Sequence, residues 1–194
     1  MASAGTGTDD NLSKTRQIGL TLACGALYGV IALPALWQNN LSRPDLMMAL
    51  LLGCVLASLS AIDVITYRLP DVLTMPLALA GLAACAYFSP EDVAWRGLAA
   101  LVGFAMLYAV SAFYRSRRGK DGLGLGDAKL FAATGAWVGL DGLPSVLLVA
   151  SATALTGAVA AMLVGFHVRG ETRIPFGPFI ALGTWLVWLY GPFI

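Results

Sequence analysis

The stretch AIDVITYRLPD, residues 61–71, ends a long apolar run with a carboxylate, a basic residue and a proline. A second stretch, GLGLGDAKL at residues 122–130, places another carboxylate at the start of a later apolar run. The two acids are Asp63 and Asp127. A carboxylate within a membrane segment is costly and is by default a candidate for function. Both aspartates are therefore candidates if these apolar runs lie in a membrane.

The overall composition indicates that they do. The chain is 58% hydrophobic and 12% charged, with a mean hydropathy of +0.77. A soluble globular domain carries about twice that charged fraction. The formal net charge of +1 also lacks the basic excess of nucleic-acid-binding proteins. We therefore expect a lipid bilayer around the chain and no nucleic acid as a partner.

Apolar windows of about 20 residues predict an all-α, polytopic transmembrane helix bundle with about seven spans. The predicted spans are 18–37, 45–65, 72–88, 96–114, 127–140, 143–166 and 175–193. The fifth would rise only about 21 Å, so we expect it to begin or end within the bilayer. Residues 1–17 are polar and small, which predicts a disordered cytoplasmic tail before one membrane-embedded domain at 18–194.

The basic residues predict the orientation. With a cytoplasmic N-terminus, ten of the twelve lysines and arginines lie on the cytoplasmic side, as the positive-inside rule favours. These ten are Lys14, Arg16, Arg68, Arg115, Arg117, Arg118, Lys120, Lys129, Arg169 and Arg173. Arg43 and Arg96 fall on the other side. This orientation places Asp63 and Asp127 at one depth, near the cytoplasmic surface.

Two carboxylates that share a site hold one proton between them, so the pair offers an acid and a base together. In aspartic proteases the ionised member activates a water and the protonated member polarises the scissile carbonyl. Gly124 and Gly126 precede Asp127 and would let an extended peptide approach the backbone closely. The alternative is that each aspartate only caps a helix or reaches toward water at a helix end.

The sequence predicts neither a metal nor a cofactor. Cys24, Cys54 and Cys85 lie singly inside apolar runs, and His167 is the only histidine. Structural zinc sites need clustered cysteines and histidines, which this spacing does not supply.

Three motifs together resemble the type IV prepilin peptidases, which are membrane aspartic proteases of the GxGD class. They are DVITYRLPD (63–71), GLGLGDAKL (122–130) and IPFGPFIALG (174–183). The resemblance covers the chain from about residue 45 to its end, and it implies that Asp63 and Asp127 are catalytic. It also implies that further motif residues support the substrate site, namely Gly124, Gly126, Lys129, Pro175, Phe176, Gly177 and Pro178.

The resemblance implies an endopeptidase that removes the basic leader from type IV prepilins or pseudopilins, which are single-span precursor proteins. The family acts at the cytoplasmic face of the bacterial inner membrane. Its larger members carry a cytoplasmic insert after the first helix, often with paired cysteines, that is associated with N-methylation. Here QNNLSRP, residues 38–44, joins the first two predicted spans, so we expect a peptidase core without methyltransferase activity. The motifs leave the substrate's identity and the oligomeric state open.

Two other functions fit a small membrane protein. A proton-coupled transporter predicts acids near the bilayer midplane on broken helices, but the middles of the predicted spans carry no charge. A non-catalytic assembly factor for a pilus or secretion machine would need neither aspartate. 

Some polar residues and glycines near these motifs have structural interpretations. We expect Asp71 to be the N-cap of the third span. Lys129 either extends to the interface or holds an anionic group. Gly135 and Gly139 have the GxxxG spacing of close helix packing.

Overall fold

The computed structural model describes residues 23, 25–34, 43–118, 124–163 and 175–193. Within these ranges all the regular elements are helices, which confirms the all-α prediction. An apolar helix, Gly25–Pro34, precedes α2 (Arg43–Thr66), α3 (Asp71–Phe88), the short 3-10 helix η1 (Pro90–Asp92), α4 (Val93–Arg118), α5 (Leu125–Leu163) and α6 (Gly177–Tyr190). The predicted tail at 1–17, Cys24 and His167 lie outside the described residues.

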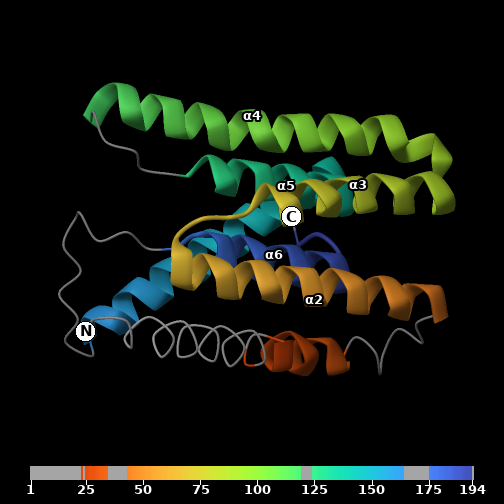
Figure 1. Cartoon of the computed structure of the whole chain (residues 1–194), viewed down its shortest axis with the longest axis horizontal. Helices are drawn as coiled ribbons and strands as arrows, with labels where there is room; N and C mark the ends of the chain where they lie inside the picture. Colours follow the sequence, from red (N-terminus) through yellow and green to blue (C-terminus); the bar gives the residue numbers. More distant parts are fainter. Residues whose placement is uncertain (1–22, 24, 35–42, 119–123, 164–174, 194) are drawn as a thin grey trace, which may run out of the picture.

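The helices lie side by side, and the described segments that connect them lie at the two ends of the bundle. Figure 1 shows that α2 and α4 finish at the end where α3, α5 and α6 begin. We call this the motif end, because it carries Asp63, near the end of α2, and Asp127, in the first turn of α5. The turn at 67–70 and the starts of α3 and α6 belong to the same end.

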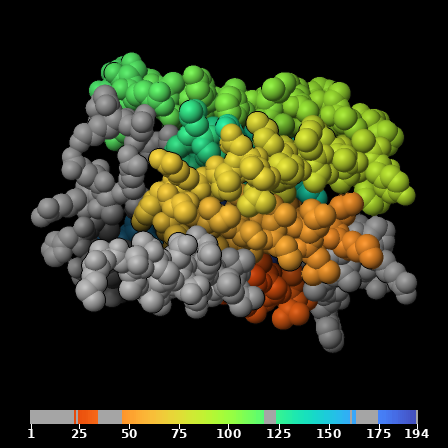
Figure 2. All heavy atoms as spheres, in the orientation of Figure 1, coloured from red at the N-terminus to blue at the C-terminus, as the bar shows by residue number. Residues whose placement is uncertain are grey.

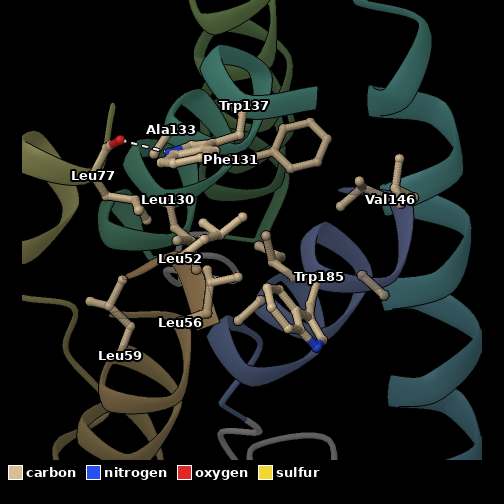
Figure 3. Packing of buried hydrophobic residues seen from close by; sticks show 14 of the residues in the cluster. Leu52, Leu56, Leu59, Leu77, Leu130, Phe131, Ala133, Trp137, Val146 and Trp185 are labelled. Carbon is tan, nitrogen blue, oxygen red and sulfur yellow. Dashed lines mark hydrogen bonds between the residues drawn. The ribbon is translucent and has the colours of Figure 1, made fainter. Parts of the chain in front are cut away.

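The first half of α5 is the central helix of the bundle. Its residues from 128 to 137 are buried almost throughout. Figure 2 shows α4, α3 and α2 as successive bands on one face, with α5 visible only in small areas between them. The indole N–H of Trp137 donates to the carbonyl oxygen of Leu77, at 2.8 Å, and so joins α5 to α3 (Figure 3).

The rest of the core is made by leucines and small residues of α2, α5 and α6. Leu52, Leu56 and Leu59 of α2 are fully buried and face Leu130 and its neighbours on α5 (Figure 3). Lipid tails are as apolar as leucine, so close packing rather than exclusion of water holds such helices together.

Gly135 shows that packing directly. A Cβ atom at Gly135 would lie 2.5 Å from the carbonyl oxygen of Ala99 on α4, so the two backbones touch. The close-packing interpretation is therefore confirmed for Gly135. Gly139 has a different role, because its φ of 76° and ψ of −177° interrupt the helix.

The chain reverses direction at Gly139. Figure 1 shows the first part of α5 running away from the motif end and the later part returning across the bundle. The interruption falls between the predicted fifth and sixth spans, at 127–140 and 143–166. Only glycine adopts this backbone conformation readily, which explains why the reversal occurs at this residue.

Within the ranges that the structure describes, four helical segments are long and apolar enough to cross a membrane. They are Met47–Thr66, Asp71–Phe88, Pro90–Arg117 and Leu125–Ala160, the last including the reversal at Gly139. Gly25–Pro34 and Gly177–Tyr190 are apolar but shorter. A helical membrane-type protein is thus supported, whereas the count of seven spans and the cytoplasmic N-terminus stay predictions.

Candidate active site

Asp63 lies in the last full turn of α2 and is buried, with 5% of its surface exposed. The helix ends just beyond it, where Tyr67 has a φ of 52° and its N–H donates to the carbonyl oxygen of Asp63. The macrodipole disfavours a negative charge in the last turn of a helix. Capping therefore does not explain Asp63, and its position works against the stability of α2.

The partner of Asp63 comes from a distant part of the chain. The backbone N–H of Gly177 donates to Oδ2 of Asp63 at 3.0 Å. Gly177 is the first residue of α6, where a helical N–H has no partner within the helix. A Cβ atom at Gly177 would lie 2.6 Å from Oδ2 of Asp63, so this approach requires glycine.

Asp127 is half-buried in the first turn of α5. Its backbone N–H donates to the carbonyl oxygen of Gly124, and its Oδ2 accepts the N–H of Gly124 at 3.3 Å. This reciprocal pairing is the carboxylate half of a capping box. Asp127 thus caps its own helix, as one alternative predicted.

The glycine motif packs against the turn that follows Asp63. A Cβ atom at Gly126 would lie 3.0 Å from Cβ of Leu69 and 3.4 Å from its backbone nitrogen. Gly126 is not among the glycines with positive φ, so close approach is what the position requires. The loop before α5 and the turn after α2 therefore lie in direct contact.

An ion pair joins the same two segments. The ammonium group of Lys129 donates to both carboxylate oxygens of Asp71 at 2.7 Å each. The N-cap of α3 is Pro70, and Asp71 is the first residue of the helix. The expectation that Asp71 is the N-cap is therefore wrong, because its side chain binds Lys129 instead. Of the two interpretations of Lys129, the structure supports the one in which it holds an anionic group.

These contacts bring the three sequence motifs to one place. The profile described as "Type IV leader peptidase family" matches residues 50–162, which is more than half of the chain. The chain belongs to the type IV leader peptidase family. The matched segment contains Asp63, Asp71, Asp127 and Lys129.

Several curated relatives carry the name "Prepilin leader peptidase/N-methyltransferase". The chain is 39% identical to the protein of Xanthomonas campestris over 74% of its own length and 50% of the relative's. It is 38% identical to the protein of Stutzerimonas stutzeri, over 88% of this chain and 57% of that one. The Neisseria gonorrhoeae protein is 36% identical, over 87% and 55%. The chain spans about half the length of the curated relatives it matches. No solved structure matches it.

The remaining family residues named from the sequence lie near this site in different roles. Phe176 is the N-cap of α6, and its carbonyl oxygen accepts the N–H groups of Phe179 and Ile180. Pro178 occupies the first turn of α6, where the missing N–H costs nothing. Pro175 is half-buried immediately before these residues. Among the described residues of this motif, Gly177 is the one that donates a hydrogen bond to a candidate catalytic carboxylate.

Leu69 was not recognised as a site residue from the sequence, although it forms the surface against which Gly126 packs. Its place inside the LPD element was the available signal. Among the described residues no group of three or more histidine, cysteine, aspartate or glutamate side chains could hold a metal ion. The described part of the site brings together the segments that carry the Asp63 and Asp127 carboxylates and the backbone N–H groups of Gly177 and Gly124 that bind them.

Proposed function

We propose that this chain is a membrane aspartic endopeptidase that removes the basic leader from type IV prepilins or pseudopilins. The observation that carries the proposal is the placement of Asp63, which is buried at the unfavourable end of α2, bound by Gly177 of α6, and at the same end of the bundle as Asp127. Membership of the type IV leader peptidase family and the names of the relatives support the same activity.

In the proposed mechanism Asp63 and Asp127 hold one proton between them. The ionised carboxylate takes a proton from a water, whose oxygen attacks the carbonyl carbon of the scissile peptide. The protonated carboxylate stabilises the developing oxyanion and a proton then passes to the leaving nitrogen as the C–N bond breaks. The pair acts as one unit, so the two steps need both residues.

The surroundings of the pair fit an extended peptide substrate. Gly124 is exposed and presents backbone without a side chain ahead of Asp127, while Gly126 lets the loop pack against Leu69. The N-terminus of α6 holds Asp63 in place through Gly177. Lys129, Pro175, Phe176 and Pro178 support these contacts from the same end of the bundle.

We place the active site at the cytoplasmic face of the bacterial inner membrane, with a cytoplasmic N-terminus and about seven spans. The described basic residues Arg68, Arg115 and Arg117 belong to the motif end, as does Lys129. An excess of lysine and arginine is typical of the cytoplasmic side. The reversal at Gly139 supports counting α5 as two spans.

Co-expression with candidate prepilins, followed by intact-mass analysis of the substrate, tests the activity. We expect loss of the leader only when the peptidase is present, and only for substrates with a basic leader. The same spectrum reports the proposed absence of methylation, because replacing one N–H hydrogen with a methyl group makes the product heavier by the mass of CH2.

The alternative function, a non-catalytic assembly factor, predicts the opposite result in this cleavage assay. It would leave every prepilin uncut while still supporting pilus or secretion assembly, and variants of Asp63 and Asp127 would behave as the parent protein does. That outcome would overturn the endopeptidase proposal.

A further inference from the structure

We propose that Asp71 and Lys129 form a positioning pair that sets the separation of the two catalytic carboxylates. The proposal rests on the endopeptidase function given above. Neither residue is assigned to proton transfer. Their effect is on the geometry of Asp63 and Asp127.

The ion pair joins the segment that follows Asp63 to the segment that follows Asp127. From Asp63 the chain passes through the end of α2 and the turn at 67–70 to Asp71. The ion pair crosses from Asp71 to Lys129 on α5. Two residues back along α5 is Asp127. The ion pair is therefore a direct link through side chains between the two segments that carry the carboxylates.

The geometry of the link is specific. Lys129 donates to both oxygens of Asp71 at equal distances of 2.7 Å, which fixes the direction of both side chains. The contact of Gly126 with Leu69 lies on the same two segments and holds them at van der Waals distance. The ion pair and this contact together restrict how the start of α5 can move relative to the turn after α2.

Stability alone does not account for the pair. The side chains are 30% and 58% exposed for Lys129 and Asp71, and exposed ion pairs contribute little to folding free energy. A displacement of about 1 Å at a catalytic group can cost on the order of 100-fold in rate. Loss of the pair should therefore change the rate of cleavage far more than the stability.

The test is a double-mutant cycle with Asp71→Asn, Lys129→Gln and the combined variant, assayed on purified enzyme and a prepilin in detergent. Rates are normalised to monodisperse protein recovered by gel filtration. We expect each single variant to lower kcat by about 10- to 100-fold with little change in KM. The combined variant should be no slower than either single one. Arg117→Gln, which removes an exposed cation from α4, is the matched control and should cleave at the parent rate.

Exchange of the charges, Asp71→Lys with Lys129→Asp, should recover much of the lost kcat. Parent-like kcat in both single variants would overturn the proposal. Additive losses in the combined variant, or a charge exchange no faster than the combined neutral variant, would overturn it as well.

A crosslinking measurement separates this proposal from the endopeptidase function. In a background without the native cysteines, Leu69→Cys and Gly126→Cys place two Cβ atoms 3.0 Å apart. This is about 0.5 Å below the range found in disulfides, so a small local adjustment is enough to admit the bond. We expect oxidation to link them rapidly and the addition of Lys129→Gln to slow that reaction. Unchanged crosslinking would contradict the positioning role whether or not the protein cleaves prepilins. If crosslinking is rapid and depends on Lys129 but the prepilin stays uncut, the result would contradict only the endopeptidase proposal.

Discussion

Asp63 is held at a place where a carboxylate destabilises the helix that carries it. The macrodipole of α2 opposes its charge, and burial removes most of its contact with solvent. One backbone N–H from Gly177 offsets part of this cost. Natural sequences keep such locally unfavourable groups mainly where function requires them.

Asp63→Asn and Asp127→Asn should each reduce leader cleavage by at least about 100-fold, because one carboxyl group cannot serve as acid and base together. The double variant should be no slower than either single one, since residues that act as a unit do not lose rate additively. Cleavage is measured by substrate mass, and membrane yield serves as the control. Substantial cleavage by either single variant would exclude the paired mechanism.

Gly177→Ala should also impair cleavage, because its new methyl group would overlap Oδ2 of Asp63. Either the carboxylate or the start of α6 must then move. We expect a loss of about 10- to 100-fold in kcat. Gly97→Ala on α4 is the control, because nothing lies within 4 Å of the added atom. Equal rates for the two variants would show that the close approach to Asp63 has no catalytic role.

At the scale of elements, the reversal of α5 decides which segments can meet. The first half of α5 extends from the motif end as the central helix, and the second half returns over α6. The guanidinium group of Arg96 on α4 donates to the carbonyl oxygen of Trp137, just before the interruption. This bond gives a partner to a carbonyl group that the broken helix leaves without one.

Gly139→Ala should destabilise the protein by about 1–3 kcal/mol, because only glycine tolerates the backbone angles of the reversal. Thermal unfolding in detergent measures the effect. Gly157→Ala, later in α5, meets only ordinary contacts with Phe179 at 3.6 Å and should leave the unfolding temperature nearly unchanged. A Gly139→Ala protein as stable as the parent would contradict the assigned conformation.

At the scale of the molecule, the two ends of the bundle should face different compartments. Single cysteines at Arg117 and Glu91, both exposed, mark the motif end and the opposite end. Each cysteine is introduced into a variant whose three native cysteines have been replaced. An impermeant thiol reagent added to intact cells should then label Glu91→Cys from outside. Arg117→Cys should react only after the membrane is opened. The reverse pattern would put the proposed active site on the wrong side.

The sequence by itself determined the helical class and the approximate limits of α2, α3 and α4, because long apolar runs ended by Arg-Leu-Pro or by a basic cluster leave few other folds. It also singled out Asp63 and Asp127, because carboxylates are rare at the ends of such runs, and the family resemblance added the Pro-Phe-Gly-Pro element. These signals are local, and each can be read from a window of about 20 residues.

Only the tertiary structure decided which groups touch. The contacts of Asp63 with Gly177, Leu69 with Gly126 and Asp71 with Lys129 join residues from 57 to 114 positions apart. The assignment of Asp71 failed for this reason: its position before a helix suits capping, and nothing local reveals a lysine on another helix. Local propensity fixes where a helix starts, but packing of the whole bundle fixes which side chains and backbone groups meet.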